Sequence, residues 1–531
     1  MKKYQNSNRR YFVGALVCVL ISTAFAVILQ FFKGDVLDYA AAGELQKTLH
    51  SAVMLVVFIL CECFFFFLYN RFSARFVVGC TRELKHDIFA SIVRRSYVAY
   101  KEHPQGEYIA KYTNEADAIK ERRFRMLPIF WEILFKIILV SVALFLLDWR
   151  IAIITIALLT TPLYIPKLIE KRLQHAQSAY LQAVEENLAK VNDWLSGFEI
   201  IKNYSIERKI MGRFKAVNDS TMEKLLKDTQ LGAVSQLITT LISYLSYFTV
   251  LVCSTGLVLK GAFTPGDFFI AIGMIDQLSY PLIALAGITR QLIAIKPACA
   301  EMEAFLNVPE SAPGISNAKN LNRDICFKDV SFSYDGERSI LNRFSLTIDK
   351  GKRYLLTGPS GCGKTTAINL LLKYYDVTDG HIAIDDTPIN QISSTYDLMT
   401  VVRQEATLFH DTLRNNLTMY REVPDGRLFD VLKSVGLERY ADAQSLDSII
   451  TENGSNFSGG EKKRICLARA LLRDTDVLIL DEPLANLDAA TAERIEDLIL
   501  SIPHKTVLVV SHQFSKIKLP QFDHVVGFAA R

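Results

Sequence analysis

The sequence is poor in charge and in the residues that mark disordered, fibrous or disulfide-bonded chains. Only 22% of its 531 residues are charged and 50% are hydrophobic, which excludes an intrinsically disordered protein. Its 26 glycines and 15 prolines are too few for a collagen-like repeat, and nine cysteines in so long a chain exclude a disulfide-rich miniprotein. The net charge of +4 is too small to predict a nucleic-acid partner.

Long apolar stretches are abundant in the first part of the chain. Six of them precede residue 300, at residues 11–32, 52–69, 127–147 and 151–169 and within 231–259 and 267–295. A helix needs about 20 residues to cross the hydrocarbon layer, and soluble core helices rarely run this long without a polar stripe. We therefore predict an all-α membrane domain of six transmembrane helices. The first stretch exceeds the apolar region of a signal peptide, so we expect it to be retained.

Basic residues indicate the orientation of these spans. They crowd residues 1–10 and the two long segments that follow the second and fourth stretches, whereas the other connections hold only Lys33, Lys47, Arg150 and Lys260. The positive-inside rule then places both termini in the cytoplasm of a multi-pass protein, which we expect in a bacterial inner or plasma membrane. Both long segments read as helices that continue the spans into the cytoplasm, and residues 174–227 in the second have almost no proline or glycine.

The composition changes after Pro309. Residues 310–323 are polar and contain Pro313 and Gly314, which is typical of a linker. Beyond them, short β-rich runs alternate with helical ones, the pattern of an α/β domain. The predicted organisation is a transmembrane domain at 1–309, a linker at 310–323 and an α/β domain at 324–531.

A phosphate-binding loop opens this second domain. Residues 353–357 read as a strand, 358–365 spell GPSGCGKT, and a helical run follows, so the GxxxxGK[ST] pattern has its required strand–loop–helix setting. Backbone N–H groups of such a loop wrap the phosphates beside a helix N-terminus. The predicted contacts are Lys364 with the β- and γ-phosphates and Thr365 with Mg²⁺.

Two further elements point to nucleotide chemistry. Residues 477–480 form a fully apolar run, as in a strand buried on both faces, and end in Asp481 and Glu482. Asp481 is a predicted Mg²⁺ ligand and Glu482 a predicted base for the attacking water. Ser458 followed by Gly459, Gly460 and Glu461 precedes a helix at 462–472. Either Ser458 and Glu461 simply form a capping box, or Ser458 and the two glycines form a second anion site.

These motifs, in this order, resemble those of an ABC transporter of the exporter type, with membrane and ATPase domains fused as a half-transporter. The loop at 358–365 is similar to the Walker A motif, 477–482 to Walker B, and 457–461 to the LSGGQ signature. Phe457 and Glu461 depart from the usual Leu and Gln, but the phosphate-contacting Ser458, Gly459 and Gly460 remain, so we expect an active site. Residues 106–114 and 197–204 are similar to the two cytoplasmic coupling segments of the family.

The resemblance implies a full set of site residues. Its catalytic group comprises Glu482, His512 as the switch histidine, Lys364 and the Q-loop residue Gln404, and its Mg²⁺ ligands are Thr365, Gln404 and Asp481. The implied ATP-binding residues are Tyr334, stacked on adenine, with Gly358, Ser360, Gly361, Cys362, Gly363, Lys364, Thr365, Thr366, Ser458, Gly459 and Gly460.

The same resemblance implies how such a chain works and with whom. Two copies, or this chain and a close homologous half-transporter, would clamp two ATP molecules between Walker A of one and the signature of the other. ATP-driven closure would switch the spans between inward and outward openings, moving a peptide, lipid or amphipathic small molecule out of the cytoplasm. An importer built on the same fold, for instance of a metal chelate, and an ATP-gated channel or regulatory membrane protein are alternatives that the sequence leaves open.

Ionisable residues inside predicted spans are candidate substrate contacts, because charge in a bilayer is costly. They are Glu62, Glu132, Lys136, Asp276 and Arg290. Glu132 and Lys136 are four residues apart and can pair on one helix face, whereas Glu62 has no evident local partner.

Overall fold

The computed structural model describes residues 1–531 except 161–165, 308–318, 337, 360, 486 and 529–531. The chain divides into two compact units, which we treat separately. The first contains Met1–Val93 and Pro104–Val308, and the second contains Arg94–His103 and Pro309–Arg531. Most of the predicted linker, up to residue 318, lies outside the described residues.

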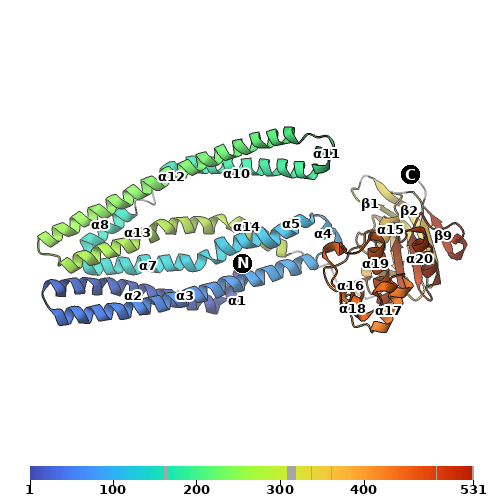
Figure 1. The fold of residues 1–531 in the computed structure, drawn as a ribbon, viewed down its shortest axis with the longest axis horizontal. Helices are drawn as coiled ribbons and strands as arrows, with labels where there is room; N and C mark the ends of the chain where they lie inside the picture. The colour runs from blue at the N-terminus through green and yellow to red at the C-terminus, as the bar shows by residue number, and fades with distance from the viewer. Residues whose placement is uncertain (161–165, 308–318, 337, 360, 486, 529–531) are drawn as a thin grey trace. The chain divides into compact units, whose positions relative to one another are not determined.

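The first unit is helical throughout (Figure 1). Its α-helices are α1 (Lys2–Ser7), α2 (Arg9–Ala41), α3 (Leu45–Val93), α5 (Gln105–Ala110), α6 (Ala116–Ile119), α7 (Met126–Leu147), α8 (Trp149–Leu159), α10 (Pro166–Ser196), α11 (Phe198–Asn203), α12 (Glu207–Leu259), α13 (Pro265–Ala294) and α14 (Lys296–Leu306). Two π-helical turns, Lys111–Glu115 and Lys120–Phe124, join α5, α6 and α7 into one continuous rod.

Five helical rods in the described residues are long and apolar enough to cross a membrane: Arg9–Ala41, Leu45–Val93, Gln105–Leu147, Glu207–Leu259 and Pro265–Leu306. They contain five of the six predicted spans. The fourth predicted span, 151–169, begins in the shorter apolar helix α8, and its residues 161–165 lie outside the described part of the chain.

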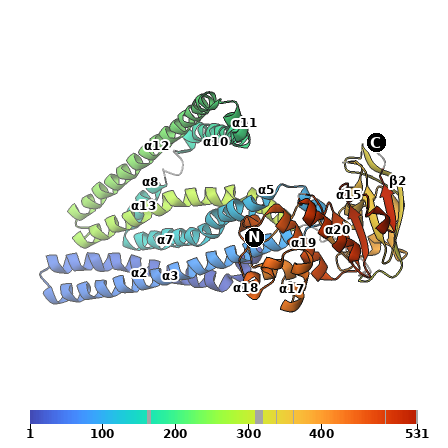
Figure 2. The same cartoon turned by 45° about the vertical axis from the view of Figure 1, so that its right-hand side comes forward.

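These rods extend well beyond the apolar stretches that predict them. Helix α3 has 49 residues, or about 74 Å of α-helix, more than twice the thickness of a hydrocarbon layer. Helices α2 and α3 lie side by side, as do α10 and α12, and both views show α11 at one end of the α10–α12 pair (Figures 1 and 2). The expected helical extension over 174–227 is confirmed, with a break only around α11.

The helices pack through small apolar clusters and leave much of their surface uncovered. Val140, Leu144 and Met274 are fully buried where α7, α8, α12 and α13 meet. In the most apolar window of α3, by contrast, only 6% of the residues are buried within the chain, at a mean hydropathy of 2.6. Such a surface is suited to lipid or to a second copy of the protein rather than to water.

The second unit combines two sheets with helices. An antiparallel sheet has the order β2-β1-β4-β5, and a parallel sheet has the order β6-β7-β8-β3-β9. The strands are β1 (Asp324–Ser333), β2 (Ser339–Asp349), β3 (Arg353–Thr357), β4 (Asp379–Ile384), β5 (Thr387–Pro388), β6 (Met399–Val402), β7 (Val477–Asp481), β8 (Thr506–Val510) and β9 (His524–Gly527). The helices are α4 (Tyr97–Lys101), α15 (Lys364–Leu371), α16 (Leu413–Thr418), α17 (Asp425–Ser434), α18 (Ala443–Leu446), α19 (Gly459–Arg473) and α20 (Ala489–Ser501).

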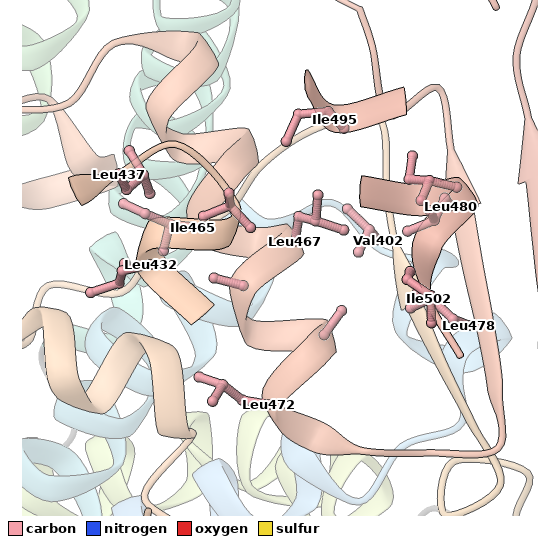
Figure 3. Close-up of a cluster of buried hydrophobic side chains, with 14 of the residues drawn as sticks. Val402, Leu432, Leu437, Ile465, Leu467, Leu472, Leu478, Leu480, Ile495 and Ile502 are labelled. Carbon is pink, nitrogen blue, oxygen red and sulfur yellow. The ribbon is translucent and has the colours of Figure 1, made fainter. Parts of the chain in front are cut away.

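The core of the second unit fixes the helix after the signature against the central strand. All five residues of β7 are buried, as expected of a parallel strand covered on both faces. Figure 3 shows Ile465 of α19 beside Leu432 and Leu437, and Leu467 of the same helix facing Val402 of β6. Because each fully buried leucine contributes about 2 kcal/mol, this cluster holds the functional loops at the ends of α19 and β7 in place.

Candidate functional site

The loop between β3 and α15 has the backbone of a phosphate-binding loop. Gly358, Gly361 and Gly363 have φ angles of +141°, +79° and +104°, which side-chain-bearing residues rarely adopt. A Cβ at Gly363 would also lie 2.8 Å from Leu341 Cδ2, and one at Gly358 would lie 2.6 Å from the Phe528 carbonyl oxygen. Glycine is therefore required here both by conformation and by space.

Lys364 lies buried beneath this loop. Its Nζ donates to the carbonyl oxygens of Gly358 and Pro359, at 2.7 and 2.8 Å, and lies 3.5 Å from the Cys362 sulfur. Thr365 is exposed at the start of α15, whereas Cys362 is buried among apolar residues of the core. The loop thus presents its ammonium group and its threonine hydroxyl from the same helical turn.

Two carboxylates lie where β7 ends. Asp481 is buried, and burial raises the pKa of its carboxyl group, while nearby Arg403 opposes that shift. Glu482 adopts a φ of +52°, and its N–H donates to the Val510 carbonyl at 2.8 Å. Left-handed backbone at a non-glycine residue costs on the order of 1–3 kcal/mol and concentrates at functional sites.

The side chain of Glu482 is held from one side only. Its Oε1 lies 2.9 Å from Nδ1 of His512, whereas Oε2 is buried and has no hydrogen-bond partner among the described residues. A buried carboxylate oxygen without a partner is rare in a folded protein. Glu482 also lines the cavity around Lys364, and a water molecule bound there can donate the missing hydrogen bond.

Most of the predicted site residues line one cavity of about 640 Å³. Its wall includes Tyr334, Gly358, Gly361, Gly363, Lys364, Thr365, Thr366, Gln404, Asp481, Glu482 and His512. Tyr334 is half exposed and its hydroxyl lies 3.2 Å from that of Thr366. Cys362 does not line the cavity, and Ser360 lies outside the described residues.

The signature residues lie elsewhere in the unit. Ser458 caps α19, and Ser458 and Glu461 form the predicted capping box, which is confirmed. Ser458, Gly459 and Gly460 do not line the cavity that contains Lys364, and Ser458 and Gly459 are exposed. A single chain therefore presents its phosphate-binding loop and its signature at separate places, each open to another molecule.

The two departures from the usual signature have structural partners. Phe457 is buried and packs against Tyr440, with ring centroids 5.2 Å apart. Glu461 forms an ion pair with Arg439 and accepts a hydrogen bond from Tyr440 at 3.2 Å. Burial favours a higher pKa for Glu461, but hydrogen bonds from Ser458 and the charge of Arg439 outweigh burial and lower that pKa. The carboxylate therefore stays ionised, and Arg439 balances its charge.

This ion pair leads to a testable expectation. Replacing Arg439 with Ala leaves an unpaired carboxylate at the N-terminus of α19, where a phosphate is expected to bind. Because Arg439 is two-thirds exposed, solvent screens the pair and the loss of ATPase rate should be only about two- to fivefold. The measurement is steady-state ATP hydrolysis by the purified protein in detergent.

The double variant Arg439→Ala/Glu461→Gln supplies the control, since removing both charges should return the rate to that of Glu461→Gln alone. A rate that stays equally low in both backgrounds would show that Arg439 acts independently of Glu461.

The structure adds residues that the motifs do not include. Arg403 precedes Gln404 and forms an ion pair with Asp481, with 3.8 Å between Nη1 and Oδ2. Lys463 is buried in α19, and its Nζ donates to the backbone oxygens of Glu482 and Ala485. Burial lowers the pKa of Lys463. A lysine on an otherwise apolar face of a helix was the only sequence signal for this contact.

The residues just before the predicted first coupling segment pack within the second unit. Residues 106–114 belong to the first unit, whereas Arg94–His103, which includes α4, packs with the second unit. The ring of Tyr97 in α4 stacks on that of Tyr374, with centroids 3.8 Å apart and planes inclined by 9°. The contact with the ATPase fold is therefore made upstream of the glycine-containing motif, by an aromatic residue.

A bundle of long apolar helices fused to a P-loop ATPase with a separate signature helix defines a half-transporter of the ATP-binding-cassette type. The chain belongs to the ABC transporter family: the family model described as ABC transporter transmembrane region matches residues 11–282, and the one described as ABC transporter matches residues 341–485. It is a multi-pass membrane protein that binds and hydrolyses ATP and couples hydrolysis to transport.

Bacterial proteins of the same organisation resemble it over most of their length. The "ATP-dependent lipid A-core flippase" of Syntrophus aciditrophicus is 25% identical over 96% of this chain and 86% of its own. The "Multidrug resistance-like ATP-binding protein MdlB" of Buchnera aphidicola is 28% identical over 88% of this chain and 82% of its own. A bacterial Atm1-family ABC exporter solved with ATP bound shares the fold, with a TM-score of 0.80 at 23% identity, over 98% of this chain and 93% of that one.

Proposed function

We propose that two copies of this chain form an exporter that moves an amphipathic, lipid-like molecule out of the cytoplasm. The observation that carries the dimeric arrangement is the separation of Ser458–Gly460 from the cavity around Lys364 within one chain. A second copy can supply the missing signature to each cavity. Because this chain has both Glu482 and an intact Ser458-Gly459-Gly460, two identical copies suffice for two complete sites.

Within each site we assign to the residues of the cavity the roles that the family resemblance implies. Tyr334 stacks on adenine, and the backbone N–H groups of 361–366 surround the phosphates, with Lys364 against the β- and γ-phosphates. Glu482 accepts a proton from water through its unpartnered Oε2, while His512 holds the carboxylate through Oε1 and reaches the γ-phosphate. Ser458, Gly459 and Gly460 of the second copy close the site.

A magnesium ion fits the residues present. Thr365, Gln404 and Asp481 offer a hydroxyl, an amide and a carboxylate oxygen to the same cavity, and Mg²⁺ prefers such hard oxygen ligands. When bound, the ion neutralises charge on the β- and γ-phosphates. The chain's own residues then hold the nucleotide and position the water that attacks it.

The orientation follows from charge. The N-terminus and the two segments at 71–125 and 167–227 hold most of the basic residues that precede residue 300. We therefore place both termini and the ATPase unit in the cytoplasm, with the spans in a bacterial plasma membrane.

The substrate class rests on two supports. Several of the relatives are named lipid A-core flippases, which marks lipids as substrates of those proteins. In this chain, large apolar side chains such as Phe64 and Phe67 of α3 are more than half exposed, and Glu132 accepts a hydrogen bond from Tyr69 at 2.7 Å rather than pairing with Lys136 as the spacing allowed. A mostly apolar bundle with a few polar groups matches a molecule that is itself amphipathic.

Reconstitution in lipid vesicles tests this proposal. We expect ATP to speed the movement of a fluorescent headgroup-labelled phospholipid between leaflets at least several-fold above the rate without ATP, measured by dithionite quenching of the leaflet facing the bath. Vesicles that contain Glu482→Gln supply the control for leakage.

A water-soluble labelled peptide enclosed in parallel vesicles separates substrate classes. ATP-dependent movement of the peptide, with none of the lipid, would contradict the proposed lipid-like substrate. Movement of both probes down their gradients in Glu482→Gln vesicles would contradict a pump and indicate a channel.

A further inference from the structure

Arg403 stands between two cavities of the ATPase unit. It lines a groove of about 410 Å³ together with Tyr374, Tyr396 and Arg473. The next residue, Gln404, lines the 640 Å³ nucleotide cavity together with Asp481. This dipeptide directly follows β6 and contributes one residue to each cavity.

The guanidinium of Arg403 has three partners. Nη1 lies 3.8 Å from Oδ2 of Asp481, Nη2 donates to Oδ1 of Asn369 at 2.8 Å, and the group lies over the ring of Tyr374, 5.3 Å from its centroid. The first partner belongs to the nucleotide cavity and the third to the groove. One rigid cation thus touches a carboxylate at one end and an aromatic ring at the other.

Asp481 depends on Arg403 for charge compensation. It is 5% exposed, and a buried carboxylate needs a counter-ion. The other cations nearby are engaged elsewhere, since Lys364 donates to Gly358 and Pro359, and Lys463 to Glu482 and Ala485. Among the described residues, Arg403 makes the only ion pair with Asp481.

The aromatic side of the contact leads to α4. Tyr374 lies face to face with Tyr97 at 3.8 Å, and Tyr97 also meets the edge of Tyr375 at 6.3 Å. Tyr375 in turn packs against Tyr334 at 5.1 Å. The segment that joins the membrane helices to this unit therefore rests on a ring that Arg403 already touches.

We propose that Arg403 is a positioning residue that couples Mg·ATP binding to α4. Before Mg·ATP binds, Arg403 balances the charge of Asp481. Once the metal cation binds that carboxylate, Arg403 shifts toward Tyr374 and changes the stacking of Tyr97 on Tyr374. The inference rests on the proposed magnesium site. Its physical basis is that two cations cannot share one buried carboxylate without repulsion. Arg403 also contacts Asn369 and Tyr374. These contacts remain when the contact with Asp481 is lost, so Arg403 moves toward them.

The competition between Arg403 and the metal is measurable. In Arg403→Gln the side chain keeps a hydrogen-bonding end toward Asn369 but loses its charge, so Asp481 should hold Mg²⁺ more tightly. We expect the free Mg²⁺ concentration that gives half-maximal ATPase activity to fall roughly tenfold, the size of effect that one neighbouring guanidinium has on a carboxylate's affinity for a proton.

Arg473→Gln is the matched control. Arg473 lines the same groove, but its guanidinium donates to the backbone of Tyr396 and makes no ion pair with Asp481 among the described residues. Arg473→Gln removes the same charge from the groove. Because Arg473 has no contact with Asp481 to lose, we expect the half-maximal Mg²⁺ concentration to stay within about twofold of the parental value.

The second measurement does not depend on turnover. In a Glu482→Gln background, Tyr97→Trp places an indole on Tyr374, and its fluorescence, corrected for Trp131, Trp149 and Trp194, should change when Mg·ATP is added. We expect the change to be lost with Arg403→Gln and kept with Arg473→Gln. ATP binding by each variant, measured with a fluorescent ATP analogue, verifies that the site is folded.

The outcomes separate the two claims. A parental protein whose ATPase rate is unaffected by removal of Mg²⁺ with EDTA refutes the proposed metal site. The role of Arg403 alone is refuted by a different result. In that case the parental protein depends on Mg²⁺, but Arg403→Gln changes neither the half-maximal Mg²⁺ concentration nor the fluorescence response of the indole introduced by Tyr97→Trp.

Discussion

Replacing Glu482 with Gln is expected to lower the rate of ATP hydrolysis at least about a hundredfold while leaving ATP binding intact, because a positioned base contributes about 10²- to 10⁴-fold. The amide keeps the shape of the carboxylate and the contact between its oxygen and Nδ1 of His512, which is 2.9 Å in the parental chain. What it removes is the negative charge at Oε2, the buried oxygen that has no partner in the described structure. The readouts are phosphate release and equilibrium binding of ATP.

The variant should also accumulate as an ATP-bound dimer, because closure of the two ATPase units depends on the γ-phosphate and reopening depends on its loss. Glu493→Gln is the charge-matched control: Glu493 is exposed on α20 and does not line the nucleotide cavity. Glu482→Gln protein that hydrolyses ATP at the rate of this control would show that another group is the base.

The elements around the nucleotide cavity are those that the sequence predicts best. The predicted strand at 353–357 is confirmed as β3, and β7 extends the predicted 477–480 by one residue. All of β7 and the central residues of β3 are buried, so each strand carries an apolar run with sharp ends. The capping box of α19 was equally predictable, because both of its members lie within one turn.

The membrane helices were predictable in kind but not in extent. Apolar length identifies a span, and the helical reading of the two long basic segments predicts that the helices continue into the cytoplasm, but neither signal fixes the ends of α3 at Leu45 and Val93. Similarly, the motif at 106–114 is recognisable by its glycine, whereas the residue that stacks on the ATPase unit is Tyr97. Nothing in a tyrosine's local sequence shows that it will meet Tyr374 in the fold.

Contacts between distant residues account for what the motifs omit. Arg403 pairs with a carboxylate 78 positions away, and Arg439 with one 22 positions away, so neither forms a local pattern. Likewise, no local pattern shows that the signature and Lys364 lie at separate places within one chain. The catalytic roles of Glu482, His512 and Gln404 stay predictions, and the Glu482→Gln variant tests the first of them.

The variant Lys364→Ala should differ from Glu482→Gln by losing binding as well as turnover. The ammonium group of Lys364 donates to two carbonyl oxygens of its own loop, at 2.7 and 2.8 Å. A bound phosphate can accept these hydrogen bonds in place of the carbonyl oxygens. A hydrogen bond to a charged group is worth about 1.5–3 kcal/mol, so the affinity for ATP should fall roughly 10- to 100-fold. Hydrolysis should be undetectable even at saturating ATP, because charge that develops on the transferred phosphoryl group loses its cation.

Lys352→Ala is the appropriate comparison. Lys352 immediately precedes β3, the strand that leads into the phosphate-binding loop, and it pairs with Asp523 at 3.1 Å on the surface. It should bind and hydrolyse ATP like the parental protein. Because Lys364 is buried and its carbonyl partners would lose their donor, thermal unfolding of both variants must accompany the measurements. A folded Lys364→Ala protein with parental affinity for ATP would mean that the loop at 358–365 does not hold the nucleotide, and the assignment of the cavity would fail with it.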